Sequence, residues 1–551
     1  MVSILKTIHD YPLATQLAQR LIVGFHDGVP DTWVQHWLAK GLGGLILFRD
    51  NVSAWQQTTG VAEAMDGLWQ TARPFHEATG LVPIMAIDQE GGHIERLTPP
   101  TFPHGINPWA LGAWLARDPQ PALAFAQQYY HTLASTLASL GFNLNCVPTL
   151  DVHLQPTNPV IGIRAYHTDP SLVTQLASVC LEAHQEAGVL TSGKHVPGHG
   201  SSMLDSHTHA LSLTLQPAEE ATFRAAITAG CPTFMVNHAQ YPGLQPTPQP
   251  ASLSPYIAQG LLREQWGFTG LLLSDDMAMA GVDANTQQDT SAPQLSPEQQ
   301  MAHTLLDALN AGMDMLLVRD SARLLVASGG WETLVAQAEK PVSAGGLDRE
   351  QHHLSLERIA AYKAGLTPYP HTTSPAQLST TQVAECSNTW VRSVWQGLQN
   401  PTVPKPNTQN GRLWVIPNLD TIPQYAPDWA PEGFTNVLQK RLQTSHPQDI
   451  VIPYAVLGDS ATTLNPTVLN ALPTNITGAL VITYHPDRFS EQSVIATHLI
   501  PALLAQGLSP DSIHLLHGHL PPTSPCWEGL AVPTGLCPSL RTPVWDMLFN
   551  S

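Results

Sequence analysis

Residues 83–88 of the chain, PIMAID, form a short apolar run that ends in a carboxylate. Seven similar runs occur in the first two thirds of the sequence, and longer helical stretches lie between them. Continuous apolar runs of this length are typical of strands that are buried on both faces, as parallel strands are. The other seven runs are residues 20–25, 43–48, 142–151, 190–195, 234–238, 271–275 and 313–318.

Eight such strands alternating with amphipathic stretches, such as residues 122–140 and 171–187, predict an α/β fold of the (β/α)8 TIM-barrel type. A barrel of this kind takes about 250 residues, and more when its loops are long. We therefore assign residues 1–365 to the barrel. Residues 283–300 are polar, aperiodic and contain proline, and we expect them to form a loop after the seventh strand.

The composition changes after the barrel. Residues 366–381 are rich in proline, serine and threonine and predict a linker. Residues 382–551 then predict a smaller α/β domain, whose own role the sequence does not indicate. Its expected strands are residues 412–418, 449–455, 478–485 and 512–519, with a helix over 491–506.

The overall charge excludes several classes of protein. The 551 residues include 24 Lys and Arg against 43 Asp and Glu, which gives a net charge of −19. A nucleic-acid-binding protein needs a basic surface, and so does a protein that docks on anionic membranes.

No apolar run reaches the roughly 18 residues of a membrane-spanning helix. The first 20 residues lack the apolar stretch of a signal peptide, and the six cysteines form no CxxC pair. We therefore expect a cytoplasmic protein with free thiols, although the spacing of Cys526 and Cys537 would allow a bridge.

Polar residues follow several of the predicted strands at their carboxyl ends. In a TIM barrel these ends meet at one mouth, where the active site lies. Acidic, basic and imidazole groups from separate strands are therefore expected to converge on a single cavity. They are Asp88, Asp151, Lys194, His195, His238 and Asp275.

The segment after the fifth strand, KHVPGHGSSMLDSHTH (residues 194–209), carries Asp205 two residues before His207. In an extended segment residues i and i+2 point the same way, so the carboxylate can reach the imidazole. An aspartate that accepts one ring proton fixes the histidine tautomer and stabilises the imidazolium. His207 is therefore a candidate general acid/base, although the same pair would also fit a hydrogen bond that only braces the loop.

A second candidate is Asp275, in the stretch GFTGLLLSDDMAM. Strand alternation points Asp275 and Asp276 in opposite directions, so we expect only one of them to face the mouth. A buried carboxylate kept ionised by hydrogen bonds and cations could attack an electrophilic carbon. Glycosyl transfer fits this arrangement, because one group forms a covalent glycosyl-enzyme while a second protonates the leaving oxygen.

The histidines of the same segment leave a metal site open as an alternative. His195, His199, His207 and His209, with Asp205, are residue types that ligate metals. The first strand, RLIVGF, has no His-x-His, and the chain has no HExxH motif. We therefore expect no metal and no cofactor, and activity after exhaustive chelation would test this expectation.

Five segments taken together resemble the signature segments of glycoside hydrolase family 3, in its β-N-acetylhexosaminidase branch. They are AIDQEGGHIERL, NPVIGIRAY, GKHVPGHGSSMLDSH, ASLSPYIAQGLLREQWGFTGLLLSDDMAM and ALNAGMDMLLV, which lie within residues 20–320. The KHxPGHG…DSH segment is the most specific, because it marks the branch that takes its acid from a His/Asp pair. Val196, His93 and Ile163 depart from the family pattern and bear on substrate preference.

The resemblance implies a retaining exo-hydrolase that removes terminal β-linked N-acetylglucosamine. Asp275 matches the family's nucleophile, His207 its acid/base and Asp205 the partner of that histidine. The implied substrates are N-acetylglucosamine-containing saccharides or muropeptides, in cell-wall recycling. The positions that match sugar-binding residues are Asp88, Arg96, Arg164, Lys194 and His195.

Two further functions remain open at this point. One is a glycoside phosphorylase, because a neutral imidazole repels phosphate less than a carboxylate does. The other is a sugar-binding or regulatory protein without turnover, which the intact Asp275, Asp205 and His207 argue against.

Overall fold

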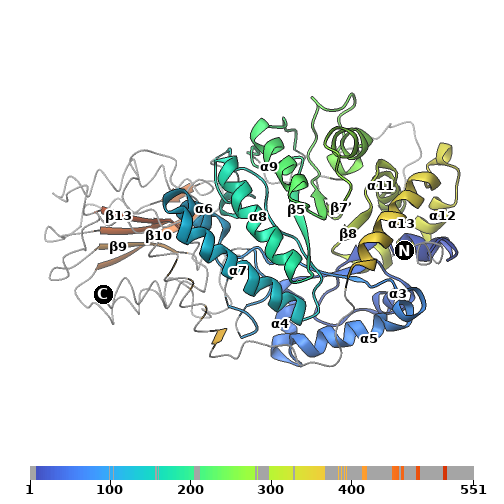
Figure 1. Ribbon diagram of the computed structural model, residues 1–551, viewed down its shortest axis with the longest axis horizontal. Helices are drawn as coiled ribbons and strands as arrows, with labels where there is room; N and C mark the ends of the chain where they lie inside the picture. The colour runs from blue at the N-terminus through green and yellow to red at the C-terminus, as the bar shows by residue number, and fades with distance from the viewer. Residues whose placement is uncertain are drawn as a thin grey trace. The chain divides into compact units, whose positions relative to one another are not determined.

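The computed structural model describes most of the first two thirds of the chain and five strands beyond it (Figure 1). The described ranges are residues 8–92, 94–98, 100–103, 105–155, 158, 160–203, 211–279, 282, 297–326, 329–366, 382–383, 386, 390, 393, 413–418, 450–457, 461–463, 479–483 and 513–517.

Eight parallel strands form a closed barrel, in which each strand pairs with its sequence neighbour and β8 pairs with β1. The (β/α)8 prediction is confirmed. The strands are β1 (Leu21–Val23), β2 (Gly44–Leu47), β3 (Ile84–Ile87), β4 (Leu144–Asn145), β5 (Leu190–Val196), β6 (Thr233–Val236), β7 (Leu271–Asp276) and β8 (Met315–Val318).

The fourth strand is much shorter than the predicted run of residues 142–151. It pairs with β3 and β5 only at Leu144 and Asn145. Pro148 follows three residues later and has no N–H to donate to a ladder. The run therefore leaves the regular strand and reaches Asp151 as irregular backbone.

Helices surround the strands of the barrel (Figure 1). The predicted helices 122–140 and 171–187 are confirmed as α7 and α8, with ends shifted by one to three residues. The helices of this part of the chain are α2 (Leu13–Ala18), α3 (Thr32–Lys40), α4 (Arg49–Gln57), α5 (Val61–Thr79), α7 (Pro119–Ser139), α8 (Pro170–Glu186), α9 (Pro217–Thr228), α11 (Pro297–Ala311), α12 (Gly330–Ala338) and α13 (Arg349–Ala364). Residues 256–265 form a further helical segment with π-type hydrogen bonds.

Side chains from alternate strand positions form one buried apolar cluster. Ile84 and Ala86 of β3, and Leu271 and Leu273 of β7, belong to it. Residues two apart in a strand point to the same face, which explains this spacing. The cluster fills the barrel interior as in other barrels of this type, so polar side chains are left to gather at its ends.

One such polar group contains Asp314, which comes just before β8. Its side chain is fully buried and pairs with Arg263 at 2.7 Å and Arg358 at 3.2 Å. It also accepts a hydrogen bond of 2.8 Å from the backbone N–H of Leu272. Because β7 and β8 both begin here, the group ties the amino-terminal ends of the two strands to residues outside the barrel.

The structure divides into two compact units, Met1–Gly105 with Pro119–Ser387, and Ile106–Asp118 with Asn388–Ser551. The second unit contains α6 (Pro108–Arg117) and a sheet in the order β11-β10-β9-β12-β13. All pairings in this sheet are parallel except β10 with β11, and the four predicted strands are present. Its strands are β9 (Leu413–Asn418), β10 (Ile450–Leu457), β11 (Ala461–Thr463), β12 (Ala479–Thr483) and β13 (Ile513–His517).

Several predicted segments fall outside the described residues. They include nearly all of the linker 366–381, the helix 491–506, and the loop 283–300 up to Pro297, where α11 begins. The domain boundaries therefore stay a prediction.

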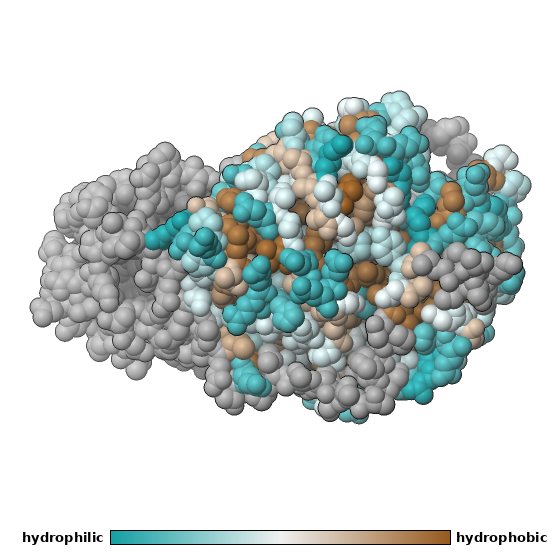
Figure 2. Space-filling view, in the orientation of Figure 1, coloured by the Kyte–Doolittle hydropathy of each residue, from teal (hydrophilic) through white to brown (hydrophobic). Residues whose placement is uncertain are grey.

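No helix in the described ranges combines the length and the apolar character needed to cross a membrane. On the face in Figure 2, apolar residues lie in patches between hydrophilic areas.

Candidate active site

A pocket opens at the carboxyl ends of the barrel strands, where the sequence places the active site. Residues in or following the strands β2 to β8 line it. The residues that matter most for its chemistry are Asp88, Glu90, Arg164, Lys194, His195 and Asp275. Of the predicted strand-end side chains, Asp88, Lys194, His195 and Asp275 line this pocket, whereas Asp151 and His238 are not among its lining residues.

Lys194 joins two carboxylates at the base of this pocket. Its Nζ lies 2.8 Å from Oδ1 of Asp88 and 2.6 Å from Oε1 of Glu90. Arg164 donates from Nε and Nη2 to the two oxygens of Glu90, at 2.9 Å each, and Arg96 lies 3.3 Å from Oδ2 of Asp88. The five side chains form one alternating network of three cations and two anions.

Burial and ion pairing shift the pKa values of these groups in opposite directions, and the effect of ion pairing is the larger. Burial alone would raise the pKa of Asp88, but Lys194 and Arg96 hold it well below its usual value. Burial would likewise raise the pKa of Glu90, yet Arg164 and Lys194 lower it to about 2. Burial alone would lower the pKa of Lys194, and the two carboxylates raise it instead. All three groups are therefore charged at neutral pH.

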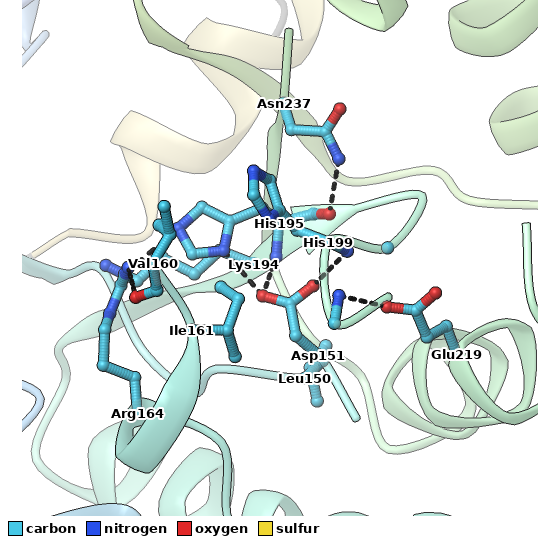
Figure 3. A network of polar contacts seen from close by, with 12 residues as sticks. Leu150, Asp151, Val160, Ile161, Arg164, Lys194, His195, His199, Glu219 and Asn237 are labelled. Carbon is cyan, nitrogen blue, oxygen red and sulfur yellow. Dashed lines mark hydrogen bonds and ion pairs between the residues drawn. The ribbon is translucent and has the colours of Figure 1, made fainter. Parts of the chain in front are cut away.

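Asp151 organises the histidine that follows Lys194. Its Oδ2 lies 2.6 Å from Nδ1 of His195 and accepts a bond of 3.1 Å from the backbone N–H of the same residue. On the other side of the ring, Nη2 of Arg164 lies 3.2 Å from Nε2 of His195. Because a guanidinium can only donate, Nε2 must accept and Nδ1 carries the proton. His195 is therefore held in one tautomer by two charged neighbours (Figure 3).

Asp275 lies near the end of β7, with its Oδ1 accepting a bond of 2.8 Å from the backbone N–H of Asp276. Both aspartates line the pocket, so the expectation that only one faces the mouth is wrong. The register of β7 against β8 shifts between Leu273 and Asp276, and this irregularity breaks the simple alternation. Asp276 accepts backbone bonds from Ala278 and Arg319, at 3.1 Å each, and burial raises its pKa.

His238, at the end of β6, supports this part of β7. Its Nε2 lies 3.1 Å from the carbonyl oxygen of Asp276, and its Nδ1 lies 2.7 Å from Oγ of Ser252. Since a carbonyl only accepts, Nε2 carries the proton and the serine hydroxyl donates to Nδ1. Burial lowers the pKa of His238, which agrees with this neutral form. Its contacts are with the backbone beside Asp275, so it steadies the strand end.

Asp205 and His207 lie outside the described residues, within 204–210, so their acid/base assignment stays a prediction. Of the departures from the family pattern, His93 also lies outside them. In the described part of the chain, no group of three or more His, Cys, Asp or Glu side chains could hold a metal ion.

The sequence reasoning did not select Glu90 as a site residue, and it named Asp151 only as a strand end. Both are buried charges that hold the residues it did select. Glu90 lies two residues after Asp88 in IDQEGG, and this spacing could have indicated that both carboxylates face the same side. The partner of Arg164 is 74 positions away in the sequence, which no local pattern reveals.

Residues 15–361 match the family model of the glycosyl hydrolase family 3 N-terminal domain. Beta-hexosaminidase A of Pseudoalteromonas piscicida is 30% identical over 341 residues, which are 59% of this chain and 54% of that protein. The chain thus spans about half the length of that relative. Beta-hexosaminidase of Stenotrophomonas maltophilia strain R551-3 is 33% identical over 258 residues, which are 45% of this chain and 70% of that protein.

Among solved structures, a family 3 β-N-acetylglucosaminidase from Paenibacillus sp. strain FPU-7 matches with a TM-score of 0.71 and 23% identity. The match covers 98% of this chain and 97% of that one. At this identity the likeness concerns the fold, and it extends over both units.

Proposed function

The chain belongs to glycosyl hydrolase family 3, and we propose that it is a retaining exo-β-N-acetylhexosaminidase that releases terminal β-linked N-acetylglucosamine. The position of Asp275 carries this proposal. Its carboxylate lies at the carboxyl end of β7 and lines the same pocket as Asp88, Lys194 and His195. The relatives at 30% and 33% identity are named β-hexosaminidases, which supports this substrate class.

In the proposed first step, a carboxylate oxygen of Asp275 attacks the anomeric carbon as the bond to the leaving oxygen breaks. His207 gives its proton to that oxygen, and Asp205 stabilises the histidine. In the second step His207 takes a proton from water, which attacks the anomeric carbon and frees Asp275. Two inversions leave the sugar with its original β-configuration.

Asp88, Arg96, Arg164, Lys194 and His195 are proposed to bind the sugar. Lys194 has three N–H donors, and Asp88 and Glu90 engage two of them. The remaining donor can serve a sugar hydroxyl. Hydrogen bonds to charged groups are about twice as strong as those between neutral groups, so this network can fix the orientation of the ring.

The proposed substrates are N-acetylglucosamine-containing saccharides or muropeptides, and the proposed setting is cell-wall recycling in the cytoplasm. Cys146, Cys180 and Cys231 are buried free thiols.

An assay with paired aryl β-glycosides tests the activity. We expect hydrolysis of the N-acetylglucosaminide, little turnover of the matching glucoside, and the β-anomer as the first product seen by proton NMR. Release of the α-anomer would contradict the retaining mechanism. Sugar 1-phosphate formed in phosphate buffer would identify a phosphorylase instead, and loss of activity on chelation would favour a metal-dependent hydrolase.

A further inference from the structure

Buried side chains hold the backbone of residues 195–200, which we call the 195–200 segment. It continues β5 and leads along the chain toward Asp205. On its donor side, the backbone N–H of His199 bonds to Oδ1 of Asp151 at 2.8 Å, and that of Gly200 bonds to Oε1 of Glu219 at 2.6 Å. Figure 3 shows the carboxyl groups of Asp151 and Glu219, each bonded to a neighbouring part of this segment.

The carbonyl groups of the same segment are bound as well. Asn237 donates to the carbonyl oxygen of His195 at 2.9 Å, and Asn158 donates to that of His199 at 2.8 Å. The hydroxyl of Tyr241 donates to the carbonyl oxygen of Gly198. Side chains from several elements therefore fix the direction in which the chain leaves β5.

Glu219 lies in the first turn of α9 and is 1% exposed. The segment packs tightly on its side chain: a Cβ added to Gly198 would come within 2.5 Å of Cδ of Glu219. Gly198 also has a φ of 149°, which favours glycine. The absence of a side chain at this position is what lets Glu219 reach the N–H of Gly200.

The surroundings of Glu219 disfavour its charge. Burial raises its pKa to about 8, and the nearby anion of Asp151 adds to this effect; together they outweigh the hydrogen bonds from the backbone at Gly200 and Gln216, which lower the pKa. Tyr241, His195 and His199 are the other titratable groups of the elements around it; burial lowers the pKa of His199 to about 4 and raises that of Tyr241, so these two are neutral. Within the described residues, Oε2 of Glu219 has no hydrogen-bond partner and no cation pairs with the group.

We propose that Glu219 is a positioning residue that acts as an uncharged carboxylic acid, accepting the N–H of Gly200 and so orienting the 195–200 segment. This inference rests on the proposed function, because the segment carries His195 and leads to the proposed acid/base pair. Asp151, as the anion, then holds the ring of His195, and Glu219, as the neutral acid, holds the backbone at Gly200. Ionisation of Glu219 would place a second buried anion beside Asp151 and loosen this arrangement.

The experiment compares Glu219→Gln, Glu219→Ala and the control Glu220→Gln through pH profiles of kcat/KM from pH 5 to 10. Glutamine keeps the carbonyl acceptor and cannot ionise. We expect kcat/KM of the parent to fall near pH 8. Glu219→Gln should stay within about threefold of the parent at pH 7 and should lack this fall. Glu219→Ala should fall at least tenfold at pH 7, mainly in kcat. Glu220 is an exposed neighbour on α9, and its variant should follow the parent.

Three results would overturn the inference. One is a Glu219→Gln protein as inactive as Glu219→Ala, another is an unchanged alkaline limb in Glu219→Gln, and the third is failure of Glu219→Gln to fold at pH 7. A parent protein without any turnover of β-N-acetylglucosaminides would refute the proposed function instead. Turnover by the parent together with any of the three results would refute only the role of Glu219.

Discussion

Arg164 and Glu90 form a two-pronged ion pair, with Nε and Nη2 of the arginine each 2.9 Å from a carboxylate oxygen. The Glu90 side chain is 1% exposed, and Lys194 lies 2.6 Å from one of the same oxygens. Arg164 also contacts Nε2 of His195. A single buried carboxylate thus aligns three of the side chains proposed to bind the sugar.

The first prediction concerns Glu90→Gln. The change leaves two buried cations short of a counter-charge, and breaking a buried ion pair costs about 3–5 kcal/mol. Denaturant unfolding should show a loss of that size. We also expect kcat/KM to fall at least tenfold, because Arg164 and Lys194 lose their common anchor. Unchanged stability and activity would contradict this account of the network.

The acid stability of the protein should depend on the same residue. The pKa of Glu90 is lowered from 4.5 to about 2, so its ionised form stabilises the fold above pH 4.5. This contribution is lost as the pH falls from 4.5 through 2. Glu90→Gln should therefore be less stable than the parent at pH 6, and the difference should shrink toward pH 2. A difference that does not depend on pH would contradict this interpretation.

Asp151→Asn should disturb His195 without removing it. The amide can present its N–H₂ group to Nδ1, which would force the ring toward the opposite tautomer and place a proton on Nε2 opposite Arg164. We expect kcat/KM to fall by at least tenfold. Nitrogen-15 NMR of the His195 ring should report protonated Nδ1 in the parent and a changed pattern in the variant. A parent spectrum with the proton on Nε2 would refute the assigned tautomer.

Asp314→Ala serves as a structural comparison, because this residue lies by the amino-terminal ends of β7 and β8. It leaves Arg263 and Arg358 without their buried carboxylate and frees the N–H of Leu272. We expect a loss of about 3–5 kcal/mol in the free energy of unfolding. The folded fraction should keep the kcat/KM of the parent. A selective loss of kcat without loss of stability would contradict a purely structural role.

His207→Ala tests the proposed acid directly. Protonation matters most for leaving groups that are poor on their own. The variant should therefore slow alkyl glycosides far more than activated nitrophenyl glycosides. An equal loss for both would refute the acid role of His207, and Asp205→Ala should show the same selectivity to a smaller degree.

The barrel could be predicted from the sequence because each strand is an apolar run with its own polar end, and a local pattern records both. The early end of β4 follows from Pro148, because a pattern of apolar residues does not register the missing N–H of a proline. The two aspartates at the end of β7 could not be placed by alternation, since the register shift against β8 depends on the neighbouring strand.

The supporting residues of the site were harder to find. Glu90 and Glu219 act on groups 74 and 19 positions away in the sequence, through contacts that exist only once the barrel has closed. A local pattern indicates a charged residue at these positions and does not indicate its partner. Asp205 and His207 were selected from their spacing and then matched by resemblance, and their geometry stays a prediction.

The central claim is that Asp275 forms a covalent bond to the sugar, and trapping tests it most directly. The protein would be incubated with a 5-fluoro N-acetylglucosamine donor carrying a good leaving group, digested, and mapped by mass spectrometry. We predict a mass increase of one fluorosugar on the peptide that contains Asp275, and none in Asp275→Ala. A label on another residue, or turnover of N-acetylglucosaminides that persists in Asp275→Ala, would contradict the account.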